Sequence, residues 1–263
     1  MVVNNEIRRW PNLLIHKYLH ERSRSIGEVA EKELRNVFAT YQDRTVFVHA
    51  GLSDINSALT GNPYKCLLSV LENNFRSILA PGFTDYFRKS GVYAKKYSKP
   101  MYGKFNELFL NDAEYRTNDA CKSILVRGDY RFDDCNHHRT YSTDGCFAQL
   151  EQDDVLIASV GTPWLMCSFL HYIEAQNDVP YMIENSHKGV LIHNDEPQAI
   201  EQKCHFWEGY WRFNKLKLQR QWEHNDIVDS YDLNGLRLFF TSASEMYDFV
   251  NEKLDANKYY LVT

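Results

Sequence analysis

The sequence predicts an α/β protein with a single domain, in which helices flank a central mixed β-sheet. Short β-branched or apolar runs alternate along the chain with segments of helical periodicity, which is the pattern of this class. The 263 residues are 44% hydrophobic and 25% charged, which suits one large globular domain. No stretch rich in Pro, Gly or Ser divides the chain. We therefore expect one domain over residues 1–263, with residues 1–43 as a helical N-terminal extension.

The N-terminal half predicts a helix, a strand and a second helix. Ser25–Glu28 has the pattern of a capping box and precedes apolar residues at helical spacing. Thr45–His49 is a β-branched and aromatic run that ends in a turn at Gly51, so it predicts a strand. Asn62 can cap a helix whose first residue is a proline, and the apolar spacing extends that helix to Ile78.

The C-terminal half predicts strands alternating with two helices. Prolines and glycines interrupt residues 81–123, which we expect to be mostly loop. Apolar spacing predicts a helix from Leu165 to Gln176, and Ser244 can cap a final helix that reaches Leu254. Three runs predict strands: Val155–Gly161, Val179–Ile183 and Leu236–Phe240.

Charge and composition exclude several classes of function. The 30 Lys and Arg residues against 35 Asp and Glu residues give a net charge of −5, which disfavours nucleic acid as a partner. No apolar run approaches the roughly 18 residues of a membrane span, and the N-terminus lacks the pattern of a secretory signal. The cysteines are scattered without a CxxC pair, so we expect six reduced thiols in a cytoplasmic protein: Cys66, Cys121, Cys135, Cys146, Cys167 and Cys204.

His171 and Glu174 are the strongest candidates for catalysis. Their i, i+3 spacing places them side by side on the helix that follows the clearest strand. A carboxylate beside an imidazole fixes its tautomer and suits a general base near neutral pH. The alternative is an ion pair on a helix surface. The spacing does not predict a metal site, because the HExxH pattern is absent.

The turn after the first strand is a candidate binding site for phosphate or an oxyanion. Residues 48–53 lead from a strand through Gly51 towards a helix, and such a turn exposes backbone N–H groups. An ordinary strand–turn–helix connection remains the alternative. The GxGxxG, GxxxxGK[ST] and GxSxG patterns are absent, which excludes their dinucleotide, P-loop and serine hydrolase interpretations.

Two further segments carry candidate groups. His137 and His138 lie in a polar segment that suggests a solvated loop, although together with His171 they leave a metal-dependent hydrolase as an alternative. Residues 207–220 mix tryptophans with Lys and Arg. They predict a partly buried amphipathic segment or a lid over a substrate.

Six segments, taken in order, resemble the aminoglycoside 3-N-acetyltransferase family, and most closely relatives that modify amino sugars in polysaccharide pathways. The resemblance runs from about residue 44 to the end. The segments are Val48-His49-Ala50-Gly51-Leu52-Ser53 (a VHSSL-type loop), Pro81-Gly82-Phe83-Thr84-Asp85-Tyr86-Phe87 (PTFTxxF), Arg116–Ser123 (R[ST]x[HD]PxxS), Ser142–Phe147 (SxxSxF), Ser168–Glu174 (TxxHxxE) and Val179-Pro180-Tyr181 (VPY).

The resemblance implies acyl transfer from acetyl-CoA to an amine, with acetyl-CoA as co-substrate and no metal. It implies that His171 is the general base and that Glu174 orients it. It also implies a coenzyme-binding set: His49, Ala50, Gly51, Leu52, Ser53, Thr84 and Ser123. The physical chemistry agrees, since an attacking amine must be neutral and the thioester oxygen needs donors as it becomes an oxyanion.

The sequence also departs from the family pattern. Ala50-Gly51 replaces paired serines, Ala120 stands where the family has proline, and Met182 follows V-P-Y where the family has arginine. We therefore expect a small amino sugar, nucleotide-linked, as acceptor. An aminoglycoside acceptor and a non-catalytic, ligand-binding member of the same fold remain alternatives, and a homodimer remains open.

Overall fold

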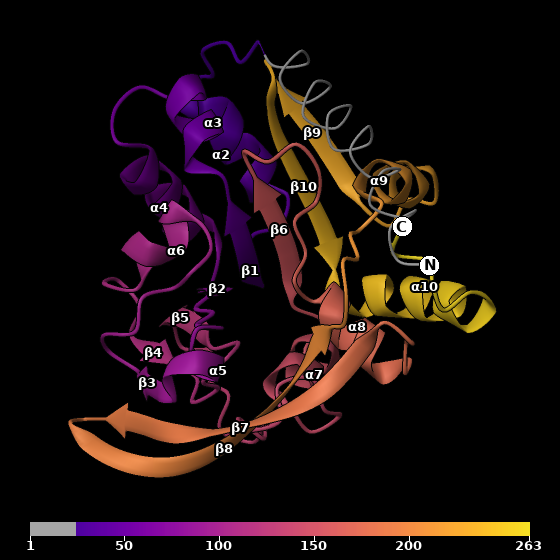
Figure 1. The fold of residues 1–263 in the computed structure, drawn as a ribbon. Coiled ribbons are helices and arrows are strands. Elements are labelled where there is room, and N and C mark those ends of the chain that lie inside the picture. Colours follow the sequence, from indigo (N-terminus) through magenta and orange to yellow (C-terminus); the bar gives the residue numbers. More distant parts are fainter. Residues whose placement is uncertain (1–24) are drawn as a thin grey trace.

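The computed structural model describes residues 25–263, in which helices cover both faces of a seven-stranded mixed sheet (Figure 1). The strand order is β4-β5-β2-β1-β6-β10-β9. The parallel strands at the centre are β1 (Thr45–Ala50), β2 (Ser77–Pro81) and β6 (Leu156–Val160). Antiparallel to their neighbours are β4 (Tyr115–Arg116), β5 (Ile124–Gly128), β9 (Asp229–Leu233) and β10 (Leu236–Ser242). The predicted fold class is confirmed.

Both faces of the central sheet are buried, because successive side chains of a strand point to opposite faces. In β1, Val46 and Val48 belong to one core and Phe47 to the other. The core of Val46 includes residues from α2 (Glu31–Ala39), α3 (Leu52–Ala58), α4 (Pro63–Asn74) and α6 (Lys104–Phe109). The core of Phe47 includes residues from α7 (Cys146–Gln152), α8 (Leu170–Gln176), α9 (Lys215–His224) and α10 (Ala243–Ala256).

A second, three-stranded sheet forms a curved arm at the lower edge of the molecule as drawn (Figure 1). It consists of β3 (Val92–Ala94), β7 (Met182–His193) and β8 (Glu196–Trp207), preceded in the chain by the short helix α5 (Phe87–Ser90). Asn194 and Asp195 connect β7 to β8 with φ values of 51° and 64°, the left-handed pair that a two-residue hairpin needs. The hairpin returns the chain so that Trp207 pairs with Met182, close to the end of α8.

Several predicted elements are confirmed. The runs at residues 45–49, 155–161 and 236–240 are strands β1, β6 and β10. Asn62 caps α4, since its side-chain oxygen accepts the backbone N–H of Lys65 at 3.0 Å. Among residues 25–263, no helix has the length and apolarity needed to cross a bilayer.

Other predicted boundaries were wrong for local reasons. The helix predicted to follow Ser25 begins only after Ala30, so Ser25 does not cap it. Ile78 lies in β2 rather than in α4, because the chain turns extended at Phe75. Ser242, not Ser244, caps α10 by accepting the N–H of Glu245, since β10 runs directly into that helix.

The same holds for the segments around α8. The helix expected from Leu165 begins at Leu170, and the strand expected from Val179 begins at Met182, after a proline that has no N–H to donate. The segment 81–123 contains short elements (α5, β3, α6 and β4) besides its loops. The part of the expected extension at residues 1–24 lies outside the described residues.

The expectation of six reduced thiols was wrong for two cysteines. Cys135 and Cys146 form a disulfide, with their Cα atoms 5.1 Å apart. The chain folds back between them, because Asn136 donates its N–H to the carbonyl of Asp144 and pairs with Gly145. The other cysteines are free, and Cys121, Cys167 and Cys204 are buried.

Candidate active site

The predicted pair of His171 and Glu174 lies on α8 with its side chains in contact. Nδ1 of His171 is 2.7 Å from Oε2 of Glu174, as the i, i+3 spacing required. The Glu174 side chain is fully buried, whereas the imidazole is 28% exposed. Because Nδ1 faces the carboxylate, Nε2 is the ring nitrogen directed away from it and can accept a proton.

The buried Glu174 carboxylate is held by three donors. Besides His171, the indole Nε1–H of Trp207 donates to Oε2 at 3.1 Å, and the Tyr181 hydroxyl donates to Oε1 at 3.0 Å. Burial, followed by the charge of Glu174, raises the pKa of Tyr181 well above its usual value, so this hydroxyl stays protonated. Three donors replace the water that the buried carboxylate has lost, so both of its oxygen atoms are hydrogen-bonded beside the imidazole.

Aromatic rings fix the orientation of the imidazole. Phe213 is stacked against His171 with ring centres 5.3 Å apart, and Trp207 meets it edge-on at 5.1 Å. Tyr141 lies on a further side at 6.3 Å. A general base needs such positioning, because small displacements of a catalytic group cost rate.

Sequence reasoning assigned no site role to Tyr181 or Trp207. Tyr181 belongs to the V-P-Y segment, and Trp207 to the aromatic segment interpreted as a lid. Their side-chain chemistry was the one indication in the sequence. Each combines a large apolar ring with one polar donor, which suits a position beside a buried hydrogen-bond acceptor. Trp207 could not be placed at Glu174 without the β7–β8 hairpin, which residues 179–183 only began to indicate.

The predicted coenzyme loop lies at the end of β1, next to the segment that leads to α8. His49 Nε2 is 3.0 Å from Oγ of Ser168 and accepts the backbone N–H of Ser168 at 3.3 Å. Gly51 donates its N–H to the carbonyl of Val160, and a Cβ at Gly51 would overlap the carbonyl oxygen of Gly161. Glycine is therefore required for the close approach of the two loops.

The imidazole of His49 carries a buried donor without a partner. Burial lowers the pKa of His49 to about 3, so the ring is neutral. Nε2 accepts from Ser168, which places the proton on Nδ1, and Nδ1 is buried with no hydrogen-bond partner among residues 25–263. A carbonyl oxygen would satisfy this donor. The rest of the predicted loop, Ala50 to Ser53, runs into α3, with Ser53 exposed.

The hydroxyls of Thr84 and Ser123 are buried and hydrogen-bonded inside the protein. Thr84 donates to the carbonyl of Ala120 at 2.7 Å, and Ser123 donates to the carbonyl of Gly82 at 2.7 Å. Both residues have no exposed surface. These two hydrogen bonds connect the loop at Gly82 with the loop at Ser123. The two hydroxyls can therefore affect a ligand only by positioning these loops.

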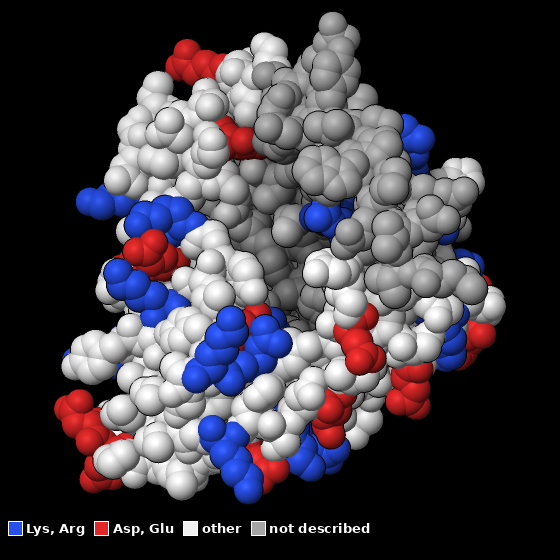
Figure 2. Space-filling model, in the orientation of Figure 1, with Lys and Arg blue, Asp and Glu red and all other residues white. Residues whose placement is uncertain are grey.

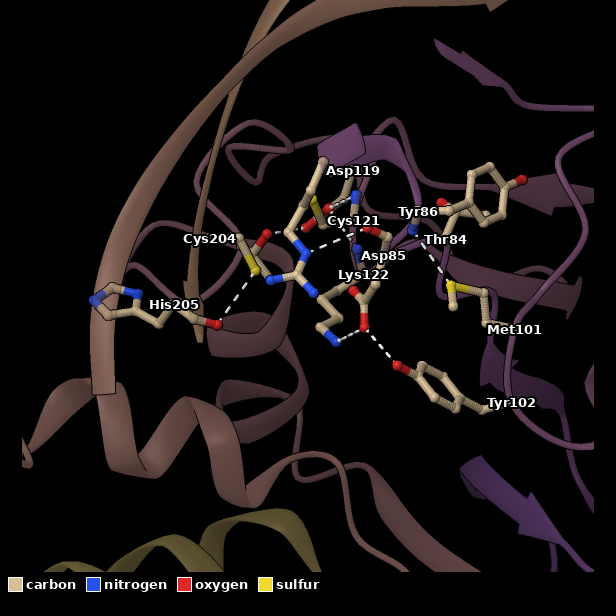
Figure 3. A network of polar contacts seen from close by, with 12 residues as sticks. Thr84, Asp85, Tyr86, Met101, Tyr102, Asp119, Cys121, Lys122, Cys204 and His205 are labelled. Carbon is tan, nitrogen blue, oxygen red and sulfur yellow. Dashed lines mark hydrogen bonds and ion pairs between the residues drawn. The ribbon is translucent and has the colours of Figure 1, made fainter. Parts of the chain in front are cut away.

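A charged network lies between these loops and strand β8 (Figure 3). The ammonium group of Lys122 is 2.7 Å from Oδ2 of Asp85, and the hydroxyl of Tyr102 donates to the same oxygen at 2.8 Å. Burial opposes the charge on Lys122, but its neighbours, with Asp85 first among them, together outweigh burial and raise the pKa of the lysine. Lys122 also lies 4.9 Å from the ring centre of Phe83, a cation–π contact.

Ring contacts connect this network to His171. Phe147 lies 6.3 Å from Phe83 and 4.9 Å from Tyr141, and Tyr141 in turn lies beside His171. Lys and Arg side chains gather over the region of α5 on the face drawn in Figure 2, with acidic side chains among them. The network and the His171 dyad are thus two parts of one region.

The histidines suggested for a metal-dependent hydrolase do not come together. Within residues 25–263, the only group of histidine, cysteine and carboxylate donors close enough for a metal ion is Cys135, His137 and Cys146. It includes neither His138 nor His171. The metal-dependent hydrolase alternative required His137, His138 and His171 to lie together, and they do not.

The motifs, the mixed sheet and the dyad on α8 lead to one family. A model of the aminoglycoside 3-N-acetyltransferase family matches residues 47–255, which is most of the chain. The chain belongs to the aminoglycoside 3-N-acetyltransferase family. This confirms the resemblance predicted from the six segments and makes the protein an N-acetyltransferase by class.

Solved structures share the fold of this acetyltransferase. YokD from Bacillus subtilis is 16% identical, with a TM-score of 0.67 over 88% of this chain and 100% of that one. The AAC-IIIb complex with CoASH is 12% identical, with a TM-score of 0.73 over 88% and 97%. AAC-VIa with sisomicin is 15% identical, with a TM-score of 0.67 over 87% and 98%. A comparison with curated protein sequences finds no match.

Proposed function

We propose that this acetyltransferase moves the acetyl group of acetyl-CoA to the amine of a nucleotide-linked amino sugar, by direct attack on the thioester. The observation that carries the proposal is the His171–Glu174 contact, in which a fully buried carboxylate faces a partly exposed imidazole at 2.7 Å. A surface ion pair, the alternative interpretation of the spacing, would not bury the carboxylate under three donors.

In this proposal His171 takes the proton from the acceptor amine through Nε2. The positive charge that develops on the ring is stabilised by Glu174 at Nδ1, and Tyr181 and Trp207 hold the carboxylate in place. A positioned general base of this kind contributes roughly 10²–10⁴-fold to the rate. No covalent enzyme intermediate is required.

The loop at the end of β1 is proposed to hold the acyl donor. Acetyl-CoA supplies an activated acyl group, and its thioester oxygen needs a donor as it becomes an oxyanion. The unpartnered Nδ1–H of His49 and the backbone N–H groups of Leu52 and Ser53, in the first turn of α3, fit that requirement. A relative of the same fold is described as a complex with CoASH, which supports coenzyme binding in this family.

The charges around the site favour an acceptor with fewer positive groups than an aminoglycoside. A polycation requires available carboxylates, but Asp85 is paired with Lys122 and Tyr102. Asp119 accepts two backbone N–H groups and the hydroxyl of Thr140. An aminoglycoside acceptor remains the second candidate, because the AAC-VIa structure contains sisomicin.

The test is a thiol-release assay with acetyl-CoA and a panel of amines. The panel contains nucleoside diphosphate amino sugars, free amino sugars and aminoglycosides at equal concentrations. The proposal expects the highest kcat/KM for a nucleotide-linked amino sugar. A higher kcat/KM for an aminoglycoside favours the second candidate. Calorimetry without heat of coenzyme A binding favours a non-catalytic member of the fold.

A further inference from the structure

A second cluster of reactive groups lies outside the His171 dyad. Cys135 and Cys146 are joined by a disulfide, and Nδ1 of His137 is 3.3 Å from Sγ of Cys146. The three donor atoms lie within 4.8 Å of one another. The proposed acyl transfer uses none of these residues.

The two sulfur atoms of this disulfide have different surroundings. Cys146 is only 4% exposed, whereas Cys135 and His137 are both partly exposed. An external thiol would therefore reach Cys135 first, and the buried Cys146 would be the leaving group. This asymmetry is what an exchange site requires, because the attacked sulfur must be accessible.

His137 lies beside the buried sulfur atom, with Nδ1 3.3 Å from Sγ of Cys146. Its Nδ1 accepts the backbone N–H of Asn118 at 3.2 Å, so the lone pair of Nδ1 is occupied and the ring proton is on Nε2. Burial, together with the charge of Lys95, lowers the pKa of His137 and keeps the ring neutral. The amide of Asn118 already occupies Nδ1, which disfavours a metal ion there.

The disulfide closes the loop that carries Tyr141 to the active site. Gln176 of α8 donates to the carbonyl of Tyr141 at 2.5 Å, and Thr140 donates its N–H to Lys203 of β8 at 3.0 Å. The Tyr141 ring lies between Phe147 and His171. The same closed loop therefore contacts the helix of the dyad and the strand that delivers Trp207.

We propose that Cys135 and Cys146 form a thiol–disulfide exchange site for low-molecular-weight thiols, and that its redox state controls the loop holding Tyr141 beside His171. The effect on catalysis rests on the proposed acyl transfer. The thiol–disulfide exchange is independent of that proposed function.

The chemistry balances with two equivalents of thiol. A thiolate attacks Sγ of Cys135, the bond between the two protein sulfurs breaks, and Cys146 leaves and takes up a proton. A second thiolate then attacks the small-molecule sulfur of the mixed disulfide, which releases the small-molecule disulfide, and Cys135 leaves as a thiolate that takes up a proton. The protein is reduced by two electrons and the two thiols are oxidised.

The first experiment equilibrates the full chain in glutathione buffers of stepped redox ratio, traps the thiols by alkylation and counts them by mass. The expected counts are four free thiols in the oxidised chain and six in the reduced chain. Tryptic mapping should locate the change at Cys135 and Cys146. Cys135→Ser should abolish the transition, and Cys66→Ser, at a free cysteine, should retain it. Six thiols at every ratio would overturn the exchange site.

The second experiment measures hydrogen exchange over residues 136–145 and the thiol-release rate in both redox states. Reduction should increase exchange in this loop and lower kcat at least about 3-fold, and Cys135→Ser should resemble the reduced chain in both states. Equal exchange and equal kcat in the two states would overturn the control of Tyr141. One equivalent of zinc held by the reduced chain and lost in Cys135→Ser would overturn the exchange site. Absence of acyl transfer in both states would count against the proposed function alone, because thiol counts and hydrogen exchange do not depend on it.

Discussion

The indole Nε1–H of Trp207 donates to Oε2 of Glu174 at 3.1 Å, joining residues 33 positions apart. Trp207 ends the long β7–β8 hairpin, whereas Glu174 lies on α8. The same Oε2 atom faces Nδ1 of His171. The arm therefore supplies a donor that positions the proposed catalytic dyad.

Replacing Trp207 by phenylalanine should lower kcat while leaving the fold intact. The phenyl ring can still pack beside His171, but the donor to Glu174 is lost. A hydrogen bond to a charged group contributes about 1.5–3 kcal/mol, so we expect kcat to fall roughly 10–100-fold. Trp211→Phe is the matched control, because its indole donates to the backbone of Glu208. Equal kcat in Trp207→Phe and the wild type would exclude this positioning role.

Asp119 should make stability depend on pH in the mildly acidic range. Burial raises the pKa of Asp119 to about 6 from 3.8. A carboxyl whose pKa is raised on folding contributes full stability below pH 3.8, and this contribution is lost as the pH rises through 6. The loss is about 3 kcal/mol for a shift of this size. Urea unfolding at pH 4 to 7 should show this decline relative to Asp119→Asn. Parallel curves for the two proteins would contradict it.

Arg116 should be essential for stability. It is 5% exposed, and its guanidinium donates to the carbonyls of Gly82, Lys95 and Ser98 and to the hydroxyl of Ser123. A lysine cannot reach all four acceptors from one nitrogen atom. Each buried acceptor left unpaired costs about 1–3 kcal/mol, so Arg116→Lys should lower the free energy of unfolding by about 2–4 kcal/mol. Chemical denaturation measures this, and Arg35→Lys on the exposed face of α2 should change little.

Gly51→Ala should destabilise the junction of β1 and β6. The φ of Gly51 is −99°, so the cost is the overlap of the new Cβ with the carbonyl of Gly161 and not backbone strain. Overpacking of this kind costs about 1–3 kcal/mol. Thermal unfolding would measure this loss of stability, with Ser57→Ala, at an exposed position of α3, as the control. An unchanged melting temperature would show that the two loops can separate freely.

The sequence predicted those helices and strands that are indicated by a short run of neighbouring residues. The continuous apolar run at residues 155–161 gave β6, and Asn62 with the following proline gave the start of α4. The β7–β8 arm was not predicted, because one face of it is exposed and its residues alternate too weakly to indicate strands of 12 residues. The turn at Asn194 and Asp195 is local, but the third strand of the arm, β3, is distant in sequence.

The same limit applies to the site. The i, i+3 spacing alone predicted the contact of His171 with Glu174, since both lie on one helix. Tyr181 and Trp207 reach Glu174 only through tertiary folding. The disulfide between Cys135 and Cys146 was missed for a similar reason, because its spacing matches no short motif and depends on the loop folding back.

The most direct test of the central claim is the rate of thiol release from acetyl-CoA by His171→Ala with the best acceptor of the panel. The account predicts that kcat/KM falls roughly 10²–10⁴-fold, as for loss of a general base. His224→Ala, at the exposed end of α9, should retain the wild-type rate. Undiminished turnover in His171→Ala, with the same melting temperature as the wild type, would contradict the role of His171 as the base.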